Sequence, residues 1–248
     1  MHTRAGGPFR LLAHLLIAGA SSVAAYWSAR LAWADILSRG APAVREHACK
    51  LDPTNPRLLE RWAESLRAAG LDDEPIMERV AALEPWNAEP RIRLALAREM
   101  RGETGRAERD LLDAARLSRL LAPRWALANF YFRRGDQERF WSAARDCLEI
   151  SSAPPIEVFA LCRSAGAGAE MVLERAMPHR PEFERAYLAW LLNEGGNDDA
   201  AGLRAVARRV AATADAGGAA VLLPYCTREI RNGSSEAALE VWNILAAR

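Results

Sequence analysis

The residues that could perform covalent chemistry are few in this chain of 248 residues, which has four cysteines and four histidines. His47 and Cys49 are close in sequence, and a thiol beside an imidazole is the pairing that a cysteine nucleophile needs. On a helix, however, residues two apart point to different faces. We therefore interpret this pair as packing residues of a repeat and not as a catalytic pair.

Motifs for phosphate binding, dinucleotide binding, zinc proteolysis and serine hydrolysis (GxxxxGK[ST], GxGxxG, HExxH and GxSxG) do not occur in the sequence. Histidine and cysteine never stand at the spacing of a metal site. Cys147, Cys162 and Cys226 have apolar neighbours, so we expect them to behave as small core residues. If the body lies outside the cytoplasm a disulfide can form, and the sequence leaves its pairing open. We expect no enzymatic activity, no cofactor and no metal ion.

Residues that could recognise a protein partner do form a pattern. Trp125, Asn129 and Arg133 are four apart, which places them on one stripe of a helix. Such a stripe can hold an extended or helical peptide through apolar anchors and one charged group. The alternative is that Phe132 packs against the next hairpin and Trp125 covers a turn. The candidate set for partner binding is Trp125, Asn129, Phe132, Arg133, Ile92 and Leu96.

The composition predicts that helices carry these residues. Half of the residues are hydrophobic and 26% are charged, which is typical of a folded protein. Alanine, leucine, arginine and glutamate are good helix formers, and no run alternates apolar and polar residues as a strand would. We expect an all-α fold. The net charge of +1 argues against a strongly basic protein, so no nucleic acid is expected among the partners.

An internal repeat organises the middle of the chain, where residues 56–85, 88–118 and 121–151 align with one another. Small residues and glycines recur in phase, both at intervals of 32 and 33 residues: Ala63, Ala95 and Ala128, then Gly70, Gly102 and Gly135. A leucine or isoleucine closes each unit, at Leu51, Leu83, Leu117 and Ile150. A fixed period with this punctuation indicates a repeat architecture.

These marks resemble the tetratricopeptide repeat, a helix–turn–helix unit of about 34 residues. The alanines match the small residue where the two helices of a unit approach closely, and the glycines match its turn. The closing turn is kept as Leu51-Asp52-Pro53 and Leu83-Glu84-Pro85, whereas Leu117-Ser118-Arg119 lacks the proline. The resemblance implies an α-solenoid of helical hairpins in which the first helix of each unit lines a concave face that binds a partner.

The flanking segments resemble less regular hairpins of the same kind. Upstream, residues 28–39 and 43–51 are expected to pair around Gly40-Ala41-Pro42. Downstream, three further pairs are expected, namely residues 156–164 with 169–176, 181–193 with 198–212, and 219–231 with 235–247. Each hairpin needs its neighbour to bury its apolar face.

Large aromatic residues are expected to fill the gaps between hairpins. Most of the tryptophans of the body are therefore predicted to be core residues, with Trp125 as the exception: Trp62, Trp86, Trp125, Trp141, Trp190 and Trp242.

The C-terminal helix is expected to lack a polar outer face. Helical spacing predicts an inward stripe of Ala238, Val241, Trp242 and Leu245. Leu239 and Ile244 then fall off this stripe, whereas a terminal repeat usually presents a polar face to water. We expect this end to dock onto something: a second copy of the chain, a partner, or a further domain. The alternative is that two apolar residues off the stripe are an ordinary surface feature.

The apolar run Leu11–Trp27 near the amino terminus predicts a membrane contact. It follows Arg4 and Arg10, ends in an aromatic pair and is close to the shortest length that spans a bilayer, about 17 residues. Two alternatives remain open: a cleaved signal peptide, for which small residues near Ala25 offer a site, and an amphipathic first helix of a soluble fold. Under the first two interpretations the basic end stays in the cytoplasm and the body lies outside the cytoplasmic (inner) membrane.

Together these features predict three regions: a membrane anchor or signal peptide over residues 1–29, tetratricopeptide repeats over 30–151, and degenerate hairpin repeats over 152–248. Because no catalytic set exists, the prediction for function is a single-pass, membrane-anchored scaffold that recruits a protein or peptide through its concave face. An accessory subunit of a bacterial envelope or polysaccharide-export enzyme system is the alternative. A helical enzyme is the weakest of the three interpretations.

Overall fold

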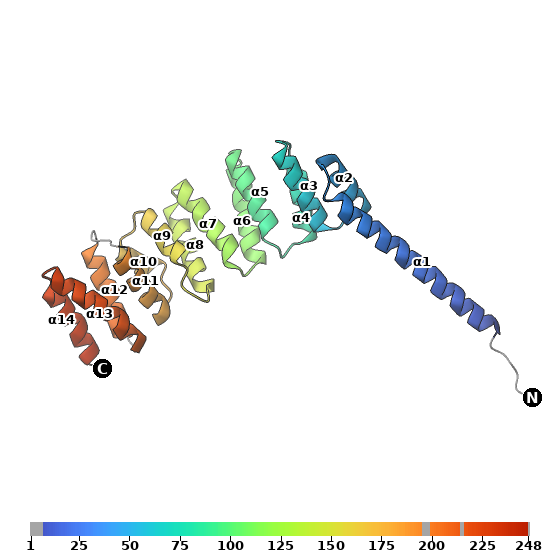
Figure 1. The fold of residues 1–248 in the computed structure, drawn as a ribbon. Coiled ribbons are helices and arrows are strands. Elements are labelled where there is room, and N and C mark those ends of the chain that lie inside the picture. Colours follow the sequence, from blue (N-terminus) through green and yellow to red (C-terminus); the bar gives the residue numbers. More distant parts are fainter. Residues whose placement is uncertain (1–6, 195–198, 214–215, 248) are drawn as a thin grey trace, which may run out of the picture. The chain divides into compact units, whose positions relative to one another are not determined.

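The computed structural model describes residues 7–194, 199–213 and 216–247, and Figure 1 traces the chain. In this part of the chain it contains fourteen α-helices and no β-strand, which confirms the all-α prediction. The chain divides into two compact units, residues 1–94 and 95–248. The division falls inside helix α5 (Glu89–Met100), so each unit is described by itself.

The first unit begins with the long helix α1 (Gly7–Leu37), which continues without a break past residue 29, where the sequence suggests a boundary. Its segment Leu12–Leu37 is long and apolar enough to cross a membrane. A signal sequence would have the same properties. Almost every described side chain from Leu12 to Ala29 is exposed, so no protein surface covers this stretch. The structure therefore leaves an apolar helix projecting from a folded base.

That base is formed where the end of α1 packs on α2 (Pro42–Leu51), which in turn packs on α3 (Pro56–Ala68). α4 (Glu74–Leu83) completes the second pair with α3. One buried cluster joins residues from all four of these helices: Ala34, Cys49, Leu58, Leu59 and Val80. Because Ala34 belongs to this cluster, the last turns of α1 are part of the folded unit and not only a tether.

The second unit contains the end of α5 and nine further helices: α6 (Thr104–Leu117), α7 (Leu121–Arg134), α8 (Gln137–Ile150), α9 (Ile156–Ser164), α10 (Ala169–Arg175), α11 (Pro181–Asn193), α12 (Ala200–Ala212), α13 (Ala216–Arg231) and α14 (Ser235–Ala246). Successive helices pack on each other, as in α7 with α8 and α13 with α14. Helices of neighbouring pairs also pack, as in α11 with α13 and α12 with α14. The core is therefore a continuous layer along this unit.

The punctuation of the repeat has a direct structural cause. Gly70, Gly102 and Gly135 follow the ends of α3, α5 and α7 with φ of +70°, +81° and +69°, a left-handed conformation that favours glycine. Ala63, Ala95 and Ala128 are all buried, at most 1% exposed. The recurring glycines thus end helices, and the recurring alanines lie in the core.

The prediction that most tryptophans are core residues is confirmed for Trp141 and Trp190, which are buried, and for Trp62, which packs against the buried cluster of the first unit; it is wrong for Trp86 and Trp242. Trp125, the expected exception, is half-buried. Trp86 and Trp242 are largely exposed. Small residues fill the helix contacts instead, because alanine lets two helices approach more closely than an indole does.

Candidate functional site

The predicted partner-binding stripe lies on α7, which carries Trp125, Asn129, Phe132 and Arg133. Leu96 lies on the part of α5 that belongs to the same unit and is exposed. Ile92 is half-buried and belongs to the first unit, with which it is described. The sequence therefore located the helical face, and the contacts of each side chain show how much of it is available to a partner.

The polar side chains of this stripe form hydrogen bonds within the chain. The guanidinium of Arg133 donates two hydrogen bonds to the carboxylate of Glu99, with Nε–Oε1 and Nη2–Oε2 distances of 3.0 and 2.6 Å. The Asn129 amide donates to the Trp125 carbonyl at 2.8 Å. The Phe132 ring packs on Phe140 of α8 with 6.1 Å between centroids. A ligand on this face would have to displace the Arg133 ion pair or rely on the half-buried Trp125.

The cysteines and histidines of the described ranges show no activated nucleophile. His47 is exposed and Cys49 is buried, so their side chains lie on different faces of α2. Burial raises the pKa of the Cys49 thiol to about 11 and those of Cys147 and Cys162 to about 12. A thiol with such a pKa stays protonated at neutral pH and is a poor nucleophile. Within the described ranges, no group of three or more histidine, cysteine or acidic residues is placed to hold a metal ion.

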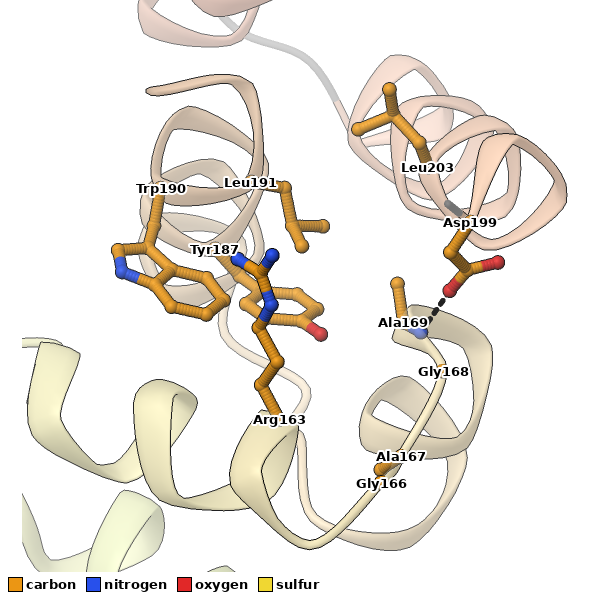
Figure 2. A pocket seen from close by; sticks show the side chains of 10 residues that line it. All are labelled: Arg163, Gly166, Ala167, Gly168, Ala169, Tyr187, Trp190, Leu191, Asp199 and Leu203. Atoms are coloured by element: carbon orange, nitrogen blue, oxygen red, sulfur yellow. Dashed lines mark hydrogen bonds between the residues drawn. The ribbon is translucent and has the colours of Figure 1, made fainter. Parts of the chain in front are cut away.

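A cavity of about 380 Å³ lies where the turn between α9 and α10 faces α11 and the start of α12 (Figure 2). Its lining comes from one turn and four helices: Arg163, Gly166, Ala167, Gly168, Ala169, Tyr187, Trp190, Leu191, Asp199 and Leu203. The sequence predicted the hairpin of residues 156–164 and 169–176 but not the cavity. Its side chains come from positions far apart in the chain, so no motif spacing indicated it.

Aromatic side chains form one wall of this cavity. Tyr187 is 2% exposed, its ring stacks on Trp190 with 6.0 Å between centroids, and Phe159 packs on it at 4.9 Å. Arg163 extends across this wall, with its guanidinium carbon 5.8 Å from the centre of the Trp190 ring, and Figure 2 shows it in front of Tyr187. The wall therefore combines flat apolar surface with one cation.

Asp199 lies on the opposite side of the cavity and caps two helices. Its Oδ1 accepts a hydrogen bond from the Gly202 backbone N–H of its own helix at 2.8 Å. Its Oδ2 accepts one from the Ala169 N–H at the start of α10 at 2.5 Å, drawn as the dashed line in Figure 2. A side chain at Gly202 would collide with this carboxylate. Asp199 thus fixes the start of α12 against the start of α10.

We predict that Asp199→Ala lowers the free energy of unfolding by about 1–2 kcal/mol, since two helix starts lose an acceptor. Urea denaturation of the full chain, followed by circular dichroism, measures this change. Asp136→Ala is the matched control, because Asp136 caps only α8 through the Arg139 N–H. An effect of Asp199→Ala no larger than that of the control would show that the contact to α10 contributes nothing.

An apolar groove of about 390 Å³ lies between α13 and α14, lined by Cys226, Ile230, Ser235, Glu236, Ala238, Leu239 and Trp242. Ile230, Leu239 and Trp242 are 61%, 58% and 63% exposed. Leu223 is similarly exposed and lies seven residues before Ile230, on the same face of α13. We call the face formed by Leu223, Ile230, Leu239 and Trp242 the terminal apolar face.

The predicted inward stripe of α14 is corrected by this arrangement. Ala237, Ala238 and Val241 are the buried residues of the helix, whereas Trp242 points to solvent. The Sγ of Cys226 on α13 lies 3.9 Å from the Ala238 carbonyl oxygen, so the two helices approach closely at the alanines. An indole does not fit at such a contact. Of the two residues expected off the stripe, Leu239 is exposed and Ile244 is half-buried.

Comparison with known proteins assigns no family: no family model matches the chain, and neither does any curated protein.

Proposed function

We propose that this protein is a non-catalytic scaffold, anchored in a membrane by α1, that recruits a helical protein through the terminal apolar face. The observation that carries the proposal is the exposure of Ile230, Leu239 and Trp242 around one groove, together with the exposed Leu223 two turns earlier on α13. A contiguous apolar patch with a tryptophan is typical of a protein-binding site, and tryptophan is prominent among residues that dominate binding energy.

The packing of the second unit favours a helix as the occupant of this face. α13 and α14 bury their other sides against α11 and α12, by the same helix-on-helix packing that joins earlier pairs. The groove between two antiparallel helices is the surface on which a further helix packs. A partner helix with apolar residues at three- and four-residue spacing would cover Leu239 and Trp242 together.

A tetratricopeptide-like α-solenoid is the architecture that we propose for the body. The in-phase left-handed glycines and the buried alanines support it, because a small residue and a tight turn at fixed positions are what a stack of hairpins requires. In this architecture each hairpin packs on its neighbours, as α13 and α14 pack on α11 and α12, and a partner helix would pack on the α13–α14 pair in the same way.

The cytoplasmic membrane, with the body on its outer side, is the location that we propose. Arg4 and Arg10 precede the apolar stretch of α1 without any acidic residue, and basic residues favour the cytoplasmic side. Tyr26, Trp27 and Arg30 follow it, and such residues are suited to the opposite interface.

A photo-reactive amino acid at position 239 tests recruitment in native membranes. We expect a discrete crosslinked product that Trp242→Glu abolishes, because a buried charge at the centre of an apolar interface is costly. The same amino acid at Leu112, an exposed position on α6, is the matched control and should give no product. A product whose mass equals two copies identifies self-association, and any other mass identifies a different partner.

Equal crosslinking at positions 239 and 112, or a product that survives Trp242→Glu, would refute this surface. The same amino acid at Trp125 provides the comparison with the α7 stripe. A product at position 125 without one at 239 would move the binding face to α7.

A further inference from the structure

The cavity in Figure 2 presents two hydrogen-bond donors that the protein itself does not satisfy. Tyr187 is almost fully buried, yet in the described part of the chain its hydroxyl has no hydrogen-bond partner and borders the cavity. Arg163 is exposed, has no acidic partner among the described residues, and places its guanidinium over the Trp190 ring. The hydroxyl of an almost fully buried tyrosine that opens into a cavity is available to a ligand atom.

The charged residues that line the cavity indicate the charge of that ligand. Asp199 is the acid that lines the cavity, and its two oxygens already accept backbone N–H groups at the starts of α10 and α12. The positive ends of two helices and these bonds compensate its charge. No acid among the described residues pairs with Arg163, so the described lining has the charge complement of a single anion.

The walls indicate the rest of the ligand. Burial raises the pKa of the Tyr187 hydroxyl far above its ordinary value, so this group remains a donor at any physiological pH. Trp190, Leu191 and Leu203 provide flat or aliphatic surface beside the two donors. A planar carboxylate fits a guanidinium fork and one hydroxyl.

We propose that this cavity binds the carboxylate of an organic acid with a flat apolar body, with Arg163 and Tyr187 donating hydrogen bonds to the carboxylate oxygens. The apolar body lies against Trp190. The site is separate from the terminal apolar face, because none of its residues lines that groove. Ligand binding and partner recruitment therefore succeed or fail independently.

Isothermal titration of the purified full-length chain in detergent tests the proposal with phenylacetate as probe. Phenylacetamide, its neutral counterpart, controls for partition of the ring into micelles. We expect saturable binding of the acid and none of the amide. Arg163→Gln should weaken binding at least about tenfold, since it removes a charge-assisted hydrogen bond. Tyr187→Phe keeps the ring and should weaken binding about three- to tenfold.

Arg119→Gln is the matched control, because Arg119 is exposed in the connection between α6 and α7 and does not line the cavity. The affinity of the Arg119→Gln variant for phenylacetate should equal that of the unaltered chain. N-acetylphenylalanine distinguishes the source of the carboxylate: tighter binding than phenylacetate indicates the end of a peptide, and weaker binding indicates a free acid. Equal binding of acid and amide, no binding of either acid at millimolar concentration, or full affinity in Arg163→Gln would overturn the proposal.

Discussion

Replacing Ala128 with tryptophan is expected to destabilise the second unit by about 3 kcal/mol, at the upper end of the cost of overpacking. Ala128 lies on α7 with no exposed surface, between a helix partner on each side, since α7 packs on both α6 and α8. An indole there must push these helices apart and lose contacts throughout the layer. Thermal and urea denaturation of the full chain, followed by circular dichroism, measures the loss.

Ala122→Trp on the same helix is the matched control, because Ala122 is exposed and an added indole meets solvent. We expect this variant to melt within a few degrees of the unaltered chain. Ala95→Trp should repeat the large effect, since Ala95 is buried at the corresponding repeat position on α5. If both buried variants melted like the control, the assigned register of the repeat would be incorrect.

The sequence predicted helix positions well because punctuation residues determine helix ends locally. Residues 181–193 were expected as a helix and form α11 with the same bounds, since Pro181 suits a first turn. Gly166 and Gly233 likewise end helices with positive φ. The region boundary expected after residue 29 is not a break in the helix, because residues 28–37 contain no glycine or proline and the helical backbone continues.

Side-chain placement was harder to predict, because it depends on which helix faces meet. Helical spacing allowed Trp242 to be either inward or outward, and the close contact at Ala238 decided the outcome. The cavity was also beyond sequence reasoning. Arg163, Tyr187 and Asp199 lie on different elements, and only the packing of α9 to α12 brings them together. The stripe on α7 was found as a helical face, but its ion pair with Glu99 was not.

The full-length protein is expected to fractionate with membranes and to resist extraction by high salt and alkaline carbonate. The reason is that the exposed apolar side chains of α1 gain more by entering lipid than by contacting water. Replacing both Ile17 and Val23 with arginine should shift most of the protein to the soluble fraction. Each charge in the middle of a span costs about 2.5–3.5 kcal/mol on insertion scales.

Deleting residues 2–27 is the complementary variant and should yield a soluble helical protein. The cut is placed before Ser28 because Ala34 is buried with Cys49 and Leu59, so a longer deletion would also damage the fold. Arg39→Glu is the matched control for a change of charge outside the apolar stretch and should stay in the membrane.

Intact mass of the membrane-bound protein decides between anchor and signal peptide: an uncleaved amino terminus supports the anchor, and a mature chain starting near Tyr26 supports a signal peptide. Full-length protein in the soluble fraction would refute both and leave α1 as a helix that some protein surface covers.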